Sequence, residues 1–177
     1  LIVIGLLFVL VFGKVTFSSF SLLNNSEQSA SQEWATITSP DGKLSVELPR
    51  NPQYVRGDPP NTLAGYSYAA SGDDHIQYIV KYENYSSVAK STGVDLRNAT
   101  PAVKQAFLKG LVDSTVDSFS LNNFVSEYDS YKEYPADKFS GTITKGSESA
   151  NVKGIVILVD ESVYYVITLA DADYTAD

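Results

Sequence analysis

The segment Ser39–Pro52, SPDGKLSVELPRNP, decides the fold because it combines a turn, an alternating strand and proline stops. Its Ser-Pro-Asp-Gly start predicts a turn, since Pro fixes φ, Asp accepts hydrogen bonds from nearby backbone and Gly tolerates positive φ. The next residues alternate between apolar and polar, which is the period of a strand with one buried face. The apolar face consists of Leu44, Val46 and Leu48, and the polar face of Lys43, Ser45 and Glu47. We therefore expect a turn followed by a strand that Pro49 and Pro52 end.

Similar patterns predict the remaining elements. We expect strands at 34–38, 43–48, 62–71, 76–82, 124–133, 138–144, 152–159 and 163–169. Thr100 and Pro101 predict a helix start, an N-cap followed by Pro at the first helical position, and this helix should end near Leu121. Its apolar face comprises Val103, Phe107, Leu108, Leu111, Val112 and Phe119. Loops or breaks are expected at 51–61, 83–99, Pro135 and 146–150.

The order of these elements is strands, one long helix and then more strands. This order predicts an α+β fold, in which an antiparallel sheet of about six to eight strands carries the long central helix on one face. The chain has 177 residues, of which 44% are hydrophobic, so it is long enough for one packed domain and short for two.

The N-terminus predicts attachment to a membrane. Residues 1–13, LIVIGLLFVLVFG, are apolar without interruption, which suits the core of a signal peptide or part of a spanning helix. We expect a hydrophobic signal-anchor helix at 1–17, a Ser- and Asn-rich flexible tether at 18–33, and the α+β domain at 34–177. The domain would then face outside the cytoplasm, periplasmic or at the cell surface, and would be secreted if the N-terminal segment is cleaved.

Composition narrows the classes of function. The formal net charge is −8 and the isoelectric point is about 4.6, which disfavours nucleic acid as a partner because phosphates require a basic face. The sequence contains no cysteine, so disulfides, thiol nucleophiles and Cys-ligated zinc are excluded. We expect no cofactor.

Several quoted stretches together resemble a known family. Trp34 is followed by ITSPDGKLSVELPRNPQ, a hairpin ending YIVKYENY, a Pro-started helix, YPADKFSG and a late VYYVITLA strand. In this order they look like the PsbP-like domains, which include small exported or membrane-anchored bacterial relatives and share the α/β/α sandwich of Mog-type proteins. The resemblance covers residues 34–177 and implies helices on both faces of the sheet, a further helix after the last strand that is missing here, and non-enzymatic roles in binding or assembly. It carries over no functional residue.

The sequence offers few groups for catalysis. His75 is the only histidine, and it falls in an expected turn. The serine elbow motif G-x-S-x-G is absent. The carboxylates Asp171, Asp173 and Asp177 lack the Gly and Glu of a calcium-binding loop. We therefore predict no catalytic, cofactor-binding or metal-binding residue.

Tyrosine is the residue type that most suggests a binding surface. There are twelve, and Tyr66 with Tyr68, and Tyr78 with Tyr82, each share a face of an expected strand. Tyr joins an apolar ring to a polar tip and is enriched at interfaces, so these four are the predicted partner-binding residues. The leading hypothesis is a membrane-tethered binding or assembly domain with a protein partner at the membrane surface and no catalysis. A carboxylate-based metal-dependent hydrolase and a self-associating structural subunit of the surface are the alternatives.

Overall fold

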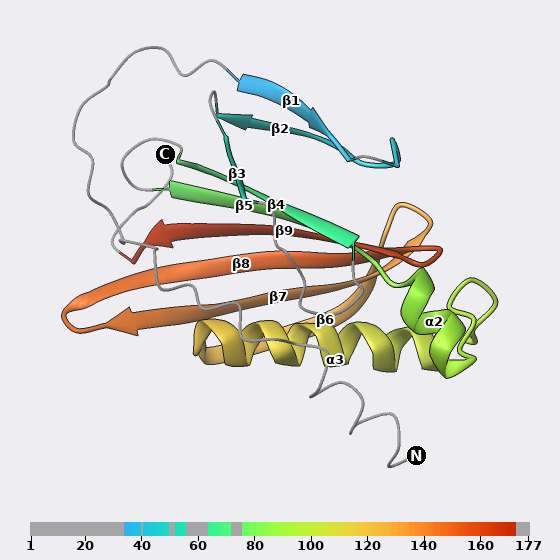
Figure 1. Cartoon of the computed structure of the whole chain (residues 1–177). Helices are drawn as coiled ribbons and strands as arrows, with labels where there is room; N and C mark the ends of the chain where they lie inside the picture. The colour runs from blue at the N-terminus through green and yellow to red at the C-terminus, as the bar shows by residue number, and fades with distance from the viewer. Residues whose placement is uncertain (1–33, 40, 50–51, 56–63, 72–75, 173–177) are drawn as a thin grey trace.

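The computed structural model describes most of the predicted domain. It covers residues 34–39, 41–49, 52–55, 64–71 and 76–172, with backbone alone at 53–55 and 64–71 (Figure 1). The predicted anchor at 1–17 and tether at 18–33 lie outside the described residues, as does the end of the chain after Ala172. Within the described ranges, no helix has both the length and the apolar character needed to cross a membrane.

Seven antiparallel strands form the larger sheet, in the spatial order β3-β4-β5-β9-β8-β7-β6. They are β3 (Gln53–Val55), β4 (Ala64–Ser71), β5 (Ile76–Asn84), β6 (Asn122–Tyr131), β7 (Tyr134–Lys145), β8 (Glu148–Val159) and β9 (Ser162–Asp171). Within β3–β5 and within β6–β9, each strand pairs with the next strand along the chain. The pairing of β5 with β9 joins these two groups into one sheet.

A second, two-stranded sheet and two helices complete the described fold. The opening segment folds as predicted into a hairpin of β1 (Trp34–Thr38) and β2 (Ser45–Pro49). The helices are α2 (Ser86–Thr92) and α3 (Pro101–Phe119). The α+β class, the antiparallel sheet and the long helix are therefore confirmed.

Several local predictions were wrong, among them the turn expected at 146–150, because β8 already begins at Glu148. Residues 83–99 contain α2. At its start, Asn84 Oδ1 accepts hydrogen bonds from the backbone N–H and the hydroxyl of Ser86. At its end, the C-cap Gly93 adopts a left-handed conformation. Pro135 does not break a strand, because it is the second residue of β7, where a missing N–H is tolerated. The expected loop at 51–61 contains the short strand β3.

The helix α3 and the β1–β2 hairpin lie on opposite sides of the larger sheet (Figure 1). On the helix side, α3 packs mainly on β7 and β8, and buried Leu108, Leu111 and Val112 face the sheet. On the hairpin side, Leu44, Val46 and Leu48 cover apolar side chains of β5 and β9, as the alternation of the opening segment predicts. We refer to these two surfaces as the helix side and the hairpin side.

The start of α3 follows the sequence prediction closely. Thr100 is the N-cap, its hydroxyl accepts a hydrogen bond from Val103 N, and Pro101 occupies the first turn. Val103 was predicted to be on the buried face, which is wrong, because its side chain, in the first turn of α3 and before the buried Leu108, is 41% exposed. Phe107 and Phe119 are partly buried and pack against the core as expected.

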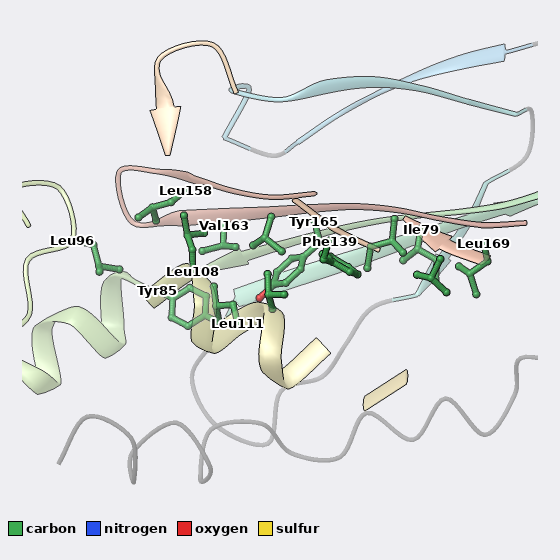
Figure 2. Packing of buried hydrophobic residues seen from close by; sticks show 14 residues of the cluster. Ile79, Tyr85, Leu96, Leu108, Leu111, Phe139, Leu158, Val163, Tyr165 and Leu169 are labelled. Carbon is green, nitrogen blue, oxygen red and sulfur yellow. The ribbon is translucent and has the colours of Figure 1, made fainter. Parts of the chain in front are cut away.

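The main core lies between α3 and the sheet, as Figure 2 shows. Its fully buried members come from distant segments: Tyr165 and Val163 on β9, Leu158 on β8, and Leu108 on α3. Phe139 on β7 lies directly opposite Gly154 on β8. A Cβ atom built on Gly154 would be 2.3 Å from Phe139 Cζ, so the ring fills the space that this glycine leaves open.

We predict that Gly154→Ala destabilises the fold by about 1–3 kcal/mol, because the added methyl group forces the Phe139 ring out of a packed core. Urea unfolding, followed by circular dichroism, measures the effect. Thr144→Ala, at an exposed position of β7, is the matched control and should change the free energy of unfolding by less than about 0.5 kcal/mol. Equal unfolding midpoints for the wild-type chain and Gly154→Ala would contradict the prediction.

Candidate binding surface on the hairpin side of the sheet

The turn between β1 and β2 is fixed to the larger sheet by the carboxylate of Asp41. One oxygen, Oδ2, accepts hydrogen bonds from the hydroxyls of Tyr164 and, at 3.2 Å, Ser162, both on β9. The other oxygen, Oδ1, accepts from Ser39 Oγ at 2.7 Å and from Lys43 N at 3.2 Å. The same carboxylate therefore shapes its own turn and holds that turn on β9.

An ion pair adds a second link between the same two places. Lys43 Nζ lies 2.6 Å from Asp160 Oδ2, in the turn between β8 and β9. Both side chains are substantially exposed, so this pair contributes little free energy on its own. Burial raises the pKa of Asp41, but the hydrogen bonds from Tyr164 and Ser39 outweigh it and hold that pKa below its ordinary value.

We predict that Asp41 makes the stability of the fold depend on pH in the acid range. Its lowered pKa means that the stabilisation is complete above the ordinary carboxyl pKa and is lost as the pH falls through the folded-state value. Asp41→Asn should cost about 1 kcal/mol at neutral pH, because the site is partly open to solvent. The measurement is urea unfolding between pH 7 and pH 3.

Tyr164→Phe serves as the second variant for this prediction, because it removes one donor and keeps the charge. The pKa of Asp41, followed by NMR titration, should rise towards the ordinary carboxyl value in this variant. An acid dependence that is identical in Asp41→Asn and wild type would contradict the role given to the carboxylate.

Beyond the hairpin, the same side of the sheet carries a groove of about 500 Å³. It runs across five neighbouring strands, β5, β9, β8, β7 and β6, near the end of β5 that begins at Ile76. Its lining residues are Ile76, Tyr78, Asn123, Ser140, Gly141, Thr142, Asn151, Val152, Lys153, Thr168 and Ala170. The volume is within the range of about 300–1,000 Å³ that is typical of ligand sites.

The first residue of the hairpin stands at this groove. The ring of Trp34 meets the ring of Tyr78 edge to face, with centroids 5.7 Å apart and an interplanar angle of 75°. Tyr78 lines the groove, while Trp34 remains 49% exposed. An aromatic pair therefore borders a cleft that has several polar side chains on a mostly apolar lining surface.

The four predicted tyrosines have different positions. Tyr78 lines the groove, whereas Tyr82 is 8% exposed and packs its ring on Tyr164 beneath the hairpin, which leaves it little surface for a partner. Tyr66 is opposite Tyr82 in the ladder and Tyr68 is opposite Val80. The side chains of Tyr66 and Tyr68 lie outside what the structure describes.

The edge strand β6 exposes two apolar side chains on the hairpin side. Val125 is 65% exposed and Tyr131 is 44% exposed. The ladder places Val125 opposite Ser140, a lining residue of the groove, and Tyr131 opposite Tyr134, which packs beneath the hairpin. We call these two residues the β6 rim. The large exposed hydrophobic side chains among the described residues are Trp34, Val103, Val125 and Tyr131, and all except Val103 lie on the hairpin side.

The carboxylates do not assemble into a metal centre in the part of the chain that the structure describes. No group of three or more His, Cys, Asp or Glu side chains there could hold a metal ion. His75, Asp173 and Asp177 lie outside the described residues, so their arrangement with Asp171 is not seen. On β6, Asp129 is ion-paired with Lys138 of β7.

The helix side holds a buried polar cluster that sequence reasoning missed. Glu83 is 8% exposed, and its Oε2 accepts hydrogen bonds from Tyr85 Oη at 2.9 Å and Tyr165 Oη at 3.0 Å. Lys81 Nζ lies 2.7 Å from Glu83 Oε1. Burial, followed by the neighbouring charge of Glu83, raises the pKa of Tyr85 well above its usual range, so both phenols remain donors. The cluster satisfies its own hydrogen bonds and therefore stabilises the core.

Asp137 is a second buried carboxyl on the helix side. It is 3% exposed beneath α3, and its Oδ1 has no hydrogen-bond partner among the described residues. Burial raises its pKa, while Lys109 on α3 opposes that shift. No signal in the sequence separates Asp137 or Glu83 from surface acids. Polar residues occur on both faces of their strands, so alternation does not show that these two carboxyls are buried.

Comparisons with known proteins assign no function to this chain. No family model matches the sequence, and no curated protein matches it. Among solved structures, it is similar to PA94, a protein of unknown function from Pseudomonas aeruginosa, at 9% identity and a TM-score of 0.37. The alignment covers 78% of this chain and 83% of that chain. A likeness at this level carries no argument about function.

Proposed function

We propose that this chain is a membrane-tethered, extracytoplasmic binding domain that holds or helps assemble a protein partner at the membrane surface, without catalysis. The tether and the location come from the apolar run at 1–13 and the polar stretch that follows it. A kinship with PsbP-like domains belongs to the same proposal, and the order of elements from Trp34 onwards supports it.

The unequal exposure of apolar side chains on the two sides of the sheet carries this proposal. The helix side buries its apolar residues under α3, whereas the hairpin side presents Trp34, Val125 and Tyr131 to solvent. Aromatic side chains at the centre of interfaces supply much of the binding energy between proteins. We therefore assign the β6 rim as the contact surface for the protein partner.

The test is recovery of a stoichiometric partner from detergent-solubilised membranes by the tagged full chain. Val125→Ser combined with Tyr131→Ser should lower the recovery at least about ten-fold, because the loss of two central apolar contacts costs 1.4 kcal/mol or more. The control is Val103→Ser, which removes a side chain of 41% exposure on α3 and should leave recovery unchanged.

Two results would contradict the proposed function. One is that the wild-type chain recovers no stoichiometric partner. The other is that Val103→Ser and the β6 rim variant lower recovery equally, which would place the contact surface elsewhere. Circular dichroism of each variant shows that the fold is retained, since all three positions are exposed and their substitution should change stability by less than about 0.5 kcal/mol each.

A further inference from the structure

The groove on the hairpin side has a chemistry that differs from that of the β6 rim. Six of its lining residues carry a hydroxyl or amide group: Tyr78, Asn123, Ser140, Thr142, Asn151 and Thr168. Most of the lining surface is nevertheless apolar, and apart from the Tyr78 ring its apolar residues are small or aliphatic. A ligand that fills this groove must therefore combine apolar faces with hydrogen-bonding groups.

Three polar side chains of the groove donate only long hydrogen bonds to the protein. Thr168 Oγ1 donates to Lys153 O at 3.4 Å, and Asn151 Nδ2 donates to Ala172 O at 3.5 Å. Thr142 Oγ1 donates to Asn122 O at 3.3 Å. Hydrogen bonds of this length are weak, so a ligand can replace them with shorter ones at little cost.

Lys153 is the only charged residue of the lining, and no carboxylate lines the groove. Among the described residues its Nζ has no hydrogen bond or ion pair, and its side chain is exposed. Its direct neighbours across the sheet are Ser140 and Thr168, both neutral. The chain has a formal net charge of −8, but the surroundings of Lys153 attract an anionic group.

The aromatic end and the length of the groove complete the description. Trp34 keeps half of its surface exposed beside Tyr78, which offers a flat apolar face at one end. From β5 to β6 the groove crosses four strand spacings, a length of about 19 Å. A sugar ring has an apolar face of C–H groups and a rim of hydroxyls, and a short chain of such rings has this length.

We propose that this groove binds a short oligosaccharide chain that carries carboxylate groups. A carboxylate of the ligand pairs with Lys153, its hydroxyls exchange hydrogen bonds with Thr168 and Asn151, and one ring stacks on Trp34. This inference goes beyond the protein partner proposed for the β6 rim. It uses different residues, so either can fail while the other stands.

The test uses Trp34 as its reporter, because the chain contains one tryptophan. The full chain in detergent is titrated with three hexamers: an oligogalacturonate, neutral cellohexaose and hexaglutamate. Oligogalacturonate should shift the Trp34 emission in a saturable manner and bind at least about three-fold more tightly than cellohexaose, the contribution of one exposed charge pair. Hexaglutamate has the same charge without sugar rings and should produce no saturable shift.

Two lysine variants locate the charge effect. Lys153→Ala should remove the preference for oligogalacturonate over cellohexaose. Lys90→Ala makes the same change of charge at an exposed position of α2, far from the groove, and should keep the preference. The β6 rim variant should also bind oligogalacturonate normally, which separates this inference from the proposed function.

The remaining outcomes overturn the inference. Saturable binding of hexaglutamate would identify an acidic peptide as the ligand class. Equal affinity for both saccharides, or no binding of either, would contradict the roles of Lys153 and the hydroxyls. If Lys153→Ala and Lys90→Ala lower the preference for oligogalacturonate equally, the preference depends on the net charge of the chain alone. The groove would then not be the binding site.

Discussion

The ladder between β5 and β9 is the interaction on which the rest of the structure depends. Its register runs from Ile76 opposite Ala170 to Asn84 opposite Ser162, and it joins the first group of strands to the last. Without it the chain would contain two separate antiparallel sheets. The buried Glu83 cluster and the groove are both built across this seam, since each combines residues of β5 and β9.

Much of the fold can be predicted from the sequence, because its determinants are local. Alternation in β2, β5 and β7 and the Thr-Pro start of α3 depend on neighbouring residues, and each predicts its element. The short helix α2 follows instead a local turn in which Ser86 donates hydrogen bonds to Asn84 Oδ1, and a hydrophobic pattern does not show such a turn. The order of strands depends on pairings between residues far apart in the chain, so alternation does not determine it.

The candidate site is less predictable, because it depends on which residues remain uncovered. Tyr78 and Tyr82 have the same spacing and the same face, yet the hairpin covers Tyr82 and leaves Tyr78 at the groove. Lys153 is one of several lysines in alternating strands, and only the pairing of strands shows that its neighbours across the sheet are neutral. Asp41 was expected to shape a turn, and the structure adds its second contact, with β9.

The two sides of the sheet therefore serve different purposes. The helix side is closed by α3, and its buried Glu83 is hydrogen-bonded within the core, whereas Asp137 Oδ1 has no partner among the described residues. The hairpin side is closed over only part of its area, and the uncovered remainder contains the groove and the β6 rim. This division places the parts that need rigidity beneath the helix and leaves chemically varied surface on the other side.

The edges of the larger sheet also limit how it can grow. One edge, β3, has three residues, which is too short to template a neighbouring chain. The other edge, β6, is ten residues long but carries Glu127 and Asp129 on one face. If two copies aligned their β6 strands antiparallel about Tyr128, Glu127 of one would meet Asp129 of the other, and like charges directly opposite are destabilising. This charge pattern therefore disfavours the pairing of two β6 edges in that register and, with it, edge-to-edge growth of the sheet.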